Sequence, residues 1–132
     1  MKVVIDTNVV ISAFVFKGNC EKVLETCYGR FNLTISTWVL QEIKNVLKRK
    51  FEIPDDKIND LEAILSESFT IVIPNNLMPN VCRDADDNNV LQLAEFIGAD
   101  YLVTGDKDLL ILKSYNNVKI FNPKEFLELF KE

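Results

Sequence analysis

The amino-acid sequence predicts an α/β fold in which helices cover both faces of a mainly parallel, five-stranded sheet. Two observations predict it. Five short apolar segments alternate along the chain with segments of helical periodicity, which is the pattern of right-handed βαβ units. The composition, 48% hydrophobic and 27% charged over 132 residues, is that of an ordinary globular domain. We therefore expect residues 1–132 to form a single domain.

Each expected strand is a short run rich in β-branched or aromatic residues. The first, Met1-Lys2-Val3-Val4-Ile5, is typical of a strand that is buried on both faces. The third ends at Pro74, which cannot donate a hydrogen bond to a neighbouring strand. The five strands are expected over residues 1–5, 31–35, 69–73, 100–103 and 118–121.

Helices are expected where apolar residues recur every three or four positions after a capping residue. Ser36 and Thr37 begin one such segment, whose apolar stripe contains Val39, Ile43 and Val46. Asp6-Thr7-Asn8, after the first strand, are capping and turn residues, but no helix is assigned to the apolar segment that follows them. Helices are expected over residues 20–28, 37–50, 54–68, 84–98, 109–112 and 124–130.

The residue types that are missing exclude several function classes. The sequence contains no histidine, which excludes a Ser-His-Asp triad, a histidine general base and histidine metal ligands. Cys20, Cys27 and Cys82 form no C-x-x-C pair, and we assign all three to the core. Their odd number disfavours a disulfide framework, so we expect a cytoplasmic protein. The longest apolar stretch, residues 9–16, is too short to span a membrane.

Two acidic residues directly follow expected strands. Asp6 comes after the first strand, and Asp106 comes after the fourth with Thr104 and Gly105 between. Ligands of parallel sheets bind beyond the carboxyl ends of the strands, so both side chains are candidates for a site at that edge. Their alternative roles are local: a helix cap or Asx-turn for Asp6, and a turn for Asp106.

Further carboxylates lie on two of the expected helices. Glu42 flanks the apolar stripe of its helix and has Val46 and Trp38 as its i+4 and i−4 neighbours, so no ion pair within the helix explains it. It is then solvent-exposed, paired across the fold, or a ligand. Where Asp84, Asp86 and Asp87 open another helix, we expect Asp84 to cap it, Asp86 to face solvent and Asp87 to point inward.

Such a cluster of acids requires protonation, basic partners or a cation, because neighbouring carboxylates repel one another. Mg²⁺ or Mn²⁺ suits it, since these hard ions favour carboxylate oxygens and can activate a water molecule without histidine. The sequence therefore predicts a divalent-metal site, and catalysis at that site.

Three stretches of the sequence resemble the PIN domain family of metal-dependent ribonucleases, in particular its stand-alone toxin subgroup. They are residues 4–12 (VIDTNVVIS), 83–88 (RDADDN) and 99–108 (ADYLVTGDKD). Together with Glu42 they span nearly the whole chain in the family's order. The resemblance implies a three-layer α/β/α sandwich, PIN-like and Rossmann-like, and hydrolysis of single-stranded RNA by metal-activated water. It also implies homodimers and inhibition by an antitoxin protein.

The resemblance assigns a role to particular residues. The catalytic, metal-binding acids fall on Asp6, Glu42, Asp87 and Asp106. Asp84 competes with Asp87 for the third position, and Asp108 assists through a water molecule. Asn8 and Thr104 match the polar positions that orient the carboxylates.

The chain carries a net charge of −5, which disfavours nonspecific binding to nucleic acid or to anionic membranes. RNA would need a local basic strip, for which the candidates are Lys44, Lys48, Arg49 and Lys50, with Lys17 opposite; the alternative is a solvated helix face. No aromatic stacking platform is identified, and Trp38 is assigned to the core or an interface.

Two other functions are compatible with an acidic α/β domain. One is a PIN-fold scaffold that binds RNA or protein without turnover, which the complete set of acids disfavours. The other is a receiver-type phosphoacceptor domain. The sequence disfavours it because Thr7 follows the first acid and Pro74-Asn75 end the third strand, where a receiver would need further acids.

Overall fold

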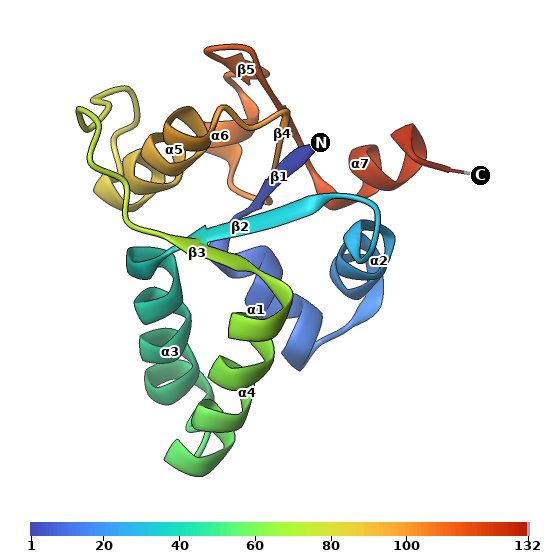
Figure 1. Cartoon of the computed structure of the whole chain (residues 1–132), viewed down its shortest axis with the longest axis vertical. Coiled ribbons are helices and arrows are strands. Elements are labelled where there is room, and N and C mark those ends of the chain that lie inside the picture. The colour runs from blue at the N-terminus through green and yellow to red at the C-terminus, as the bar shows by residue number, and fades with distance from the viewer. Residues whose placement is uncertain (132) are drawn as a thin grey trace.

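A six-stranded sheet forms the middle layer of the structure, a computed structural model that describes residues 1–131 (Figure 1). The strand order is β3-β2-β1-β4-β6-β5, and all neighbours are parallel except β5 and β6. The strands are β1 (Lys2–Ile5), β2 (Asn32–Ser36), β3 (Thr70–Val72), β4 (Tyr101–Val103), β5 (Ser114–Tyr115) and β6 (Val118–Phe121).

The expected count of five strands is wrong by one, because β5 adds a short antiparallel edge strand. Ser114 pairs with Lys119 and Tyr115 with Val118. Asn116 and Asn117 form the turn with φ angles of 47° and 69°, the left-handed conformation of tight hairpin turns. A strand of two residues is too short to show an alternating pattern, so β5 could not be predicted from the sequence.

Helices cover both faces of the sheet, which confirms the three-layer α/β/α sandwich. Helices α1 to α4 lie on one face, where α7 packs beside α2, and α5 and α6 lie on the other (Figure 1). None of the helices within residues 1–131 has the length and hydrophobicity needed to cross a membrane. The helices are α1 (Thr7–Val15), α2 (Gly18–Cys27), α3 (Thr37–Phe51), α4 (Asp55–Ser68), α5 (Ala85–Ile97), α6 (Lys107–Leu110) and α7 (Pro123–Leu129).

The helix α1 is a second element that the sequence did not predict. Asp6 caps it through a hydrogen bond that its side chain accepts from the backbone N–H of Thr7. Five of its nine residues are buried. A helix that is apolar on most sides lacks the one-sided periodicity on which helix prediction depends, and its valines and isoleucine favour strands.

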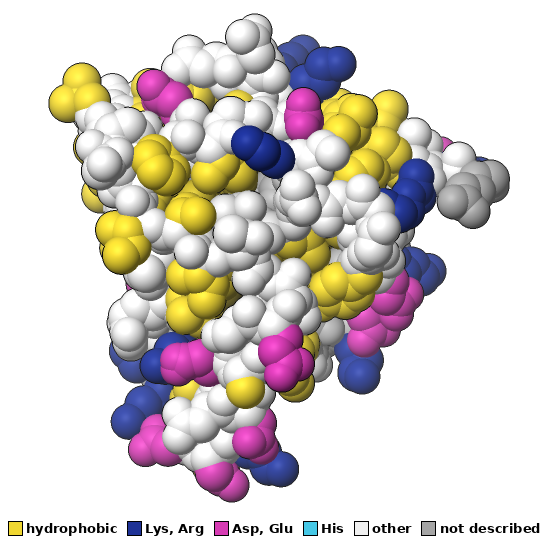
Figure 2. All heavy atoms as spheres, viewed as in Figure 1, with side chains coloured by type: hydrophobic (Ala, Val, Ile, Leu, Met, Phe, Trp, Pro, Cys, Tyr) yellow, Lys and Arg dark blue, Asp and Glu magenta, His cyan; other side chains and the backbone are white. Residues whose placement is uncertain are grey.

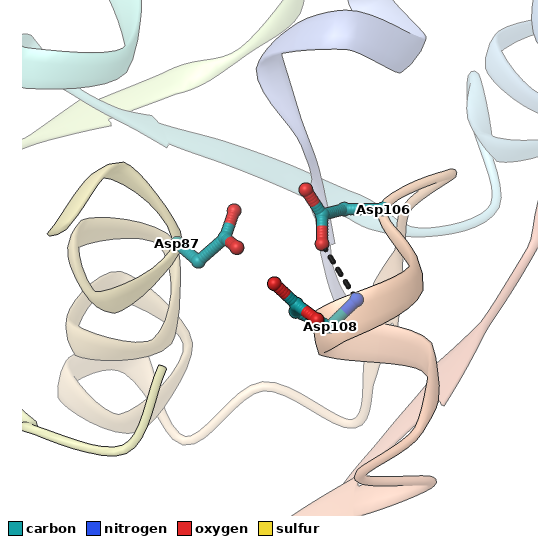
Figure 3. A group of neighbouring side chains, drawn as sticks. All are labelled: Asp87, Asp106 and Asp108. Carbon is teal, nitrogen blue, oxygen red and sulfur yellow. Dashed lines mark hydrogen bonds between the residues drawn. The ribbon is translucent and has the colours of Figure 1, made fainter. Parts of the chain in front are cut away.

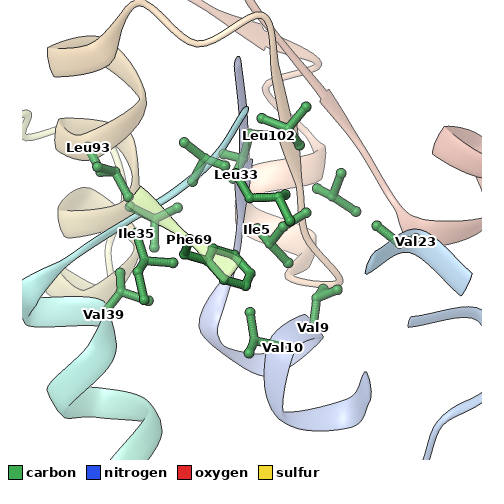
Figure 4. Packing of buried hydrophobic residues seen from close by; sticks show 14 of the residues in the cluster. Ile5, Val9, Val10, Val23, Leu33, Ile35, Val39, Phe69, Leu93 and Leu102 are labelled. Carbon is green, nitrogen blue, oxygen red and sulfur yellow. The ribbon is translucent and has the colours of Figure 1, made fainter. Parts of the chain in front are cut away.

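The core lies between the sheet and the helices on each side of it. Figure 4 shows Ile5 of β1 and Leu102 of β4 packed among side chains from the neighbouring helices and strands. Cys27 belongs to this core, as expected, whereas Cys20 and Cys82 are only half-buried against it. The central strands are therefore buried on both faces.

The strand order reverses between β1 and β4, the two central strands. The chain proceeds from β1 outward to β2 and β3 and then crosses back to β4 on the other side of β1. Ile5 pairs with Val103, so Asp6 and Thr104 stand side by side where these two strands end. Ligand sites of parallel sheets form at this kind of reversal.

Truncation of Leu102, which is fully buried on β4, is expected to destabilise the fold strongly. Leu102→Ala should lower the free energy of unfolding by about 2–5 kcal/mol, because it leaves a cavity in the central layer. Ile111→Ala, at a side chain that is 77% exposed, should change it by less than about 0.5 kcal/mol. Urea denaturation measures both values, and equal losses in the two variants would contradict this description of the core.

Candidate metal centre

Acidic side chains from four elements line a small pocket at the carboxyl ends of β1 and β4. Its volume is about 80 Å³, several times what one water molecule needs. All four acids proposed from the sequence, Asp6, Glu42, Asp87 and Asp106, are in its wall. The full lining is Asp6, Thr7, Asn8, Trp38, Glu42, Asp84, Asp86, Asp87, Val90 and Asp106.

Asp6 is the most rigidly held of these acids. Its backbone N–H donates to the carbonyl of Val103 at 2.9 Å, which ties the ends of the two central strands together. Its Oδ1 accepts from the Thr7 N–H at 2.8 Å, and its Oδ2 accepts from the Thr104 hydroxyl at 2.7 Å. The side chain is 6% exposed. Burial raises the pKa of Asp6, the two hydrogen bonds oppose that rise, and the nearby Asp106 and Asp84 add to it.

Thr104 connects Asp6 to the loop that carries Asp106. It is fully buried, and its hydroxyl accepts a hydrogen bond from the Asp106 N–H at 3.0 Å while donating to Asp6. Asp106 then caps α6, with its Oδ1 accepting from the N–H groups of Asp108 and Leu109. A single buried hydroxyl therefore sets the spacing between two acids that are 100 positions apart in the sequence.

Asp87 points inward from the first turn of α5, as the sequence predicts. It is 6% exposed, and its Oδ2 is buried without a hydrogen-bond partner. Burial raises the pKa of Asp87 to about 7, and the negative charges of Asp106, Asp6 and Asp84 add to this effect. A buried carboxylate oxygen without a donor is costly unless a proton or a cation meets it.

The neighbouring acids of α5 have the positions expected of them. Asp84 is the N-cap of the helix and accepts a hydrogen bond from the Asp86 N–H at 2.9 Å. Asp86 is exposed at the rim of the pocket. Asp84 also lines the pocket, so geometry places both Asp84 and Asp87 there, but only Asp87 is buried.

Glu42 and Asn8 complete the predicted set on the opposite wall. Glu42 of α3 is half-buried, and its carboxylate makes no ion pair or hydrogen bond within residues 1–131. Of the three alternatives for Glu42, pairing across the fold is therefore excluded. Asn8 is exposed beside the pocket.

Asp108 lies close to two of the other acids, Asp87 and Asp106. One carboxylate oxygen from each of Asp87, Asp106 and Asp108 lies within 4.8 Å of the others. Figure 3 shows the three carboxylates directed toward a shared space, Asp87 from α5 and the other two from the start of α6. Asp108 also forms an ion pair with Arg83, with Nη2 at 2.9 and 3.0 Å from its two oxygens.

These residues fit a hard divalent cation. The cluster offers carboxylate oxygens, the ligands that Mg²⁺ and Mn²⁺ prefer. The unpartnered Asp87 oxygen and the raised pKa values of Asp6 and Asp87 indicate negative charge that the protein alone does not compensate. A bound cation would compensate that charge.

Two of the four basic residues proposed as a strip on α3 pair with acids of α4. Lys44 pairs with Glu62 at 2.9 Å, and Lys48 pairs with Asp55 at 3.3 Å. Lys17 pairs with Glu21 of its own helix. Figure 2 shows basic and acidic side chains interspersed at the α3–α4 end of the molecule instead of a basic patch. Arg49, whose Nε donates to the Asn45 carbonyl, is not in an ion pair of this kind.

Two lining residues were missed from the sequence. Trp38 is half-buried in the pocket wall and is not simply a core residue, so an aromatic surface does lie beside the acids. Its position one turn before Glu42 on the same side of α3 could have indicated this. Thr7 lines the pocket as well, and its hydroxyl is buried without a partner.

The family model described as PIN domain matches residues 2–108, a segment that contains every acid named above. The chain belongs to the PIN domain family. PIN domains are in general nucleases and typically use a divalent metal ion, in agreement with the acidic cluster of this chain. Membership in this family excludes the receiver-type alternative.

A relative and several solved structures resemble the whole chain. The uncharacterized protein MJ1680 of Methanocaldococcus jannaschii is 35% identical over 147 residues, covering 100% of this chain and 93% of that protein. VapBC2 from Rickettsia felis, solved bound to a DNA fragment from its promoter, has a TM-score of 0.64 at 17% identity, covering 92% of this chain and 98% of that one.

Two further structures agree with the same fold. A PilT N-terminus domain protein of Sulfolobus solfataricus has a TM-score of 0.61 at 19% identity, covering 100% of this chain and 95% of that one. FitAcB from Neisseria gonorrhoeae has a TM-score of 0.58 at 15% identity, covering 92% and 98% respectively. At these identities the likeness establishes the fold.

The raised pKa of Asp87 predicts that the metal-free protein loses stability as pH rises. An unfolded Asp titrates near 3.9, so between about pH 4 and about pH 7 the folded state binds more protons than the unfolded state. The contribution of Asp87 to the free energy of unfolding therefore falls across that window. Asp87→Asn should lose this part of the pH dependence, as measured by urea denaturation in EDTA at about pH 5 and about pH 8.

Asp60→Asn, an exposed acid on α4, is the matched control and should follow the wild-type pH dependence. If Asp87→Asn has the same pH slope as the wild type and this control, the electrostatic description of Asp87 is wrong.

The Thr104 hydroxyl is expected to hold Asp6 in its ionised form. Thr104→Val keeps the shape but removes the donor, so the pKa of Asp6 should rise above its wild-type value. Thr104→Ser keeps the hydroxyl and should leave that pKa close to wild type. Carboxyl ¹³C NMR titration of Asp6 measures the difference; the same midpoint in the Val and Ser variants would contradict the role of this bond.

Proposed function

We propose that this PIN-domain protein is a metal-dependent endoribonuclease that hydrolyses phosphodiester bonds of single-stranded RNA. The observation that carries the proposal is the convergence of Asp87, Asp106 and Asp108 within 4.8 Å, beside the buried Asp6, in a family that consists generally of nucleases. The proposal treats residues 1–132 as one nuclease domain.

In this proposal four acids are the main metal ligands and two more are further oxygen donors. Asp6, Glu42, Asp87 and Asp106 would hold Mg²⁺ or Mn²⁺, with Asp84 and Asp108 as further oxygen donors. When bound, the ion supplies a Lewis acid that lowers the pKa of a water molecule and offsets the charge developing on the phosphate. No histidine is needed at such a site.

The surrounding residues position the acids and the strand. Thr104 holds Asp6 and the Asp106 backbone at a fixed spacing, and Asn8 would orient the groups at the rim. Trp38 offers a ring on which a base can stack without regard to its identity. Of the basic residues on α3, Lys48 and Arg49 are exposed and stay candidate RNA contacts, whereas Lys44 is half-buried and bonded to Glu62.

The biological setting belongs to the same proposal. The resemblance to the toxin subgroup supports a toxin of a toxin–antitoxin pair, a homodimer held inactive by an antitoxin protein. Free cysteines and the absence of a spanning helix within residues 1–131 agree with a location in the cytoplasm.

Removing a single ligand should abolish cleavage without unfolding the protein. Asp6→Asn and Asp106→Asn are each expected to lower the metal-dependent cleavage rate by at least about 100-fold, because they remove a charged oxygen ligand. Relief of carboxylate repulsion should leave the metal-free variants as stable as the wild type or more so. The assay is cleavage of mixed-sequence single-stranded RNA in EDTA, Mg²⁺ or Mn²⁺.

Asp56→Asn, an exposed acid on α4, controls for loss of one negative charge and should cleave at the wild-type rate. Wild-type rates in Asp6→Asn or Asp106→Asn would overturn the mechanism. Metal binding by the wild type without cleavage of any single-stranded RNA would favour a non-catalytic scaffold.

A further inference from the structure

Arg83 is a cation at the edge of the acidic cluster. Its side chain is 87% exposed, and its Nη2 lies 2.9 and 3.0 Å from the two carboxylate oxygens of Asp108. Because the cluster oxygens lie within 4.8 Å of one another, Nη2 is less than about 8 Å from each of them. Arg83 directly precedes Asp84, the cap of α5, so its backbone is anchored while its side chain reaches outward.

The ion pair between Arg83 and Asp108 is well suited to exchange. Exposed pairs of this kind contribute about 0–1 kcal/mol, so breaking one costs little. Both hydrogen bonds use Nη2, whereas a guanidinium has five N–H donors and fits a phosphate as well as a carboxylate. A phosphate group, which has more oxygens than the Asp108 carboxylate, can therefore replace Asp108 as the partner of Arg83.

Asp108 has a second set of neighbours that compete with Arg83. Its carboxylate belongs to the cluster with Asp87 and Asp106, where the Asp87 Oδ2 is buried and unpartnered. A divalent cation drawn to that oxygen would attract Asp108 and repel Arg83. A cation bound at the cluster would therefore weaken the ion pair between Asp108 and Arg83.

We propose that Arg83 binds a backbone phosphate of single-stranded RNA at the edge of the cluster formed by Asp87, Asp106 and Asp108, and that its ion pair with Asp108 positions the guanidinium before RNA binds. The inference rests on the proposed nuclease function and adds a substrate-binding residue to it. A chain with net charge −5 and an acidic pocket repels RNA, so a cation beside the cluster is what brings a phosphate to it. Lys44 and Lys48 are paired with Glu62 and Asp55 of α4. Arg83 is instead paired with Asp108, which belongs to the acidic cluster.

The test measures two equilibria on the full chain with the same variants. The first is binding of a labelled, mixed-sequence single-stranded RNA of about 12 nucleotides in EDTA, where no cleavage occurs. The second is binding of Mn²⁺ alone by titration calorimetry. Arg83→Ala should weaken RNA binding about tenfold and tighten Mn²⁺ binding several-fold, because RNA loses a phosphate contact and Mn²⁺ loses a competitor for Asp108.

Three matched variants separate this role from a general effect of charge. Lys107→Ala removes a positive charge beside Asp106 without breaking the ion pair, and should change either equilibrium by less than about twofold. Arg83→Lys keeps the charge but not the planar fork, and should fall between wild type and Arg83→Ala. Asp108→Asn releases Arg83, so RNA binding should be at least as tight as wild type while Mn²⁺ binding weakens.

RNA binding by Arg83→Ala within twofold of wild type, or equal effects of Arg83→Ala and Lys107→Ala, would overturn the assignment. Failure of the proposed nuclease function is a different result: the wild type would then cleave no single-stranded RNA with Mg²⁺ or Mn²⁺, and the binding measurement in EDTA would still report whether Arg83 contacts the strand.

Discussion

Electrostatic repulsion among buried carboxylates is the constraint on which the rest of this structure depends. Asp6 and Asp87 are each 6% exposed, and both lie with Asp84 and Asp106 around one pocket of about 80 Å³. The oxygens of Asp87, Asp106 and Asp108 lie within 4.8 Å of one another. Two charges at that separation repel by about 3–4 kcal/mol at an effective dielectric constant near 20, and burial adds to the cost of ionising the carboxyl groups. A divalent cation at this place would remove the repulsion as it binds, so the same cost would favour strong binding of such an ion.

The same residues build the fold locally and supply the site. Asp6, Asp84 and Asp106 are the N-caps of α1, α5 and α6, and each accepts a backbone hydrogen bond at the start of its helix. The cap bonds of Asp84 and Asp106 use Oδ1 only. Thr104 then links Asp6 to the Asp106 backbone across the two central strands. The starts of these helices and the ends of the central strands meet where the strand order reverses. The capping side chains therefore lie around the same pocket.

Much of this arrangement could be predicted from the sequence, because local signals determine it. Five of the six strands, the cap at Asp84 and the inward position of Asp87 follow from short-range periodicity and capping rules, and the structure confirms these elements. The features that were missed depend on contacts between distant segments. Lys44 and Lys48 are basic in the sequence but are neutralised by acids of α4, and Arg83 meets Asp108 across 25 positions. The helix α1 and the strand β5 were missed for a different reason: one is apolar on most sides and the other is two residues long.

The most direct test of this account is titration calorimetry of Mn²⁺ binding to the metal-free wild type at several pH values, in buffers of different ionisation enthalpy. With the pKa of Asp87 at about 7, binding at about pH 6 should displace about one proton, and the number released should fall toward zero by about pH 8.5. The binding should also be abolished in Asp106→Asn. An absence of binding, or binding that releases no protons at any pH and survives in Asp106→Asn, would contradict the claim that these carboxylates form the metal centre.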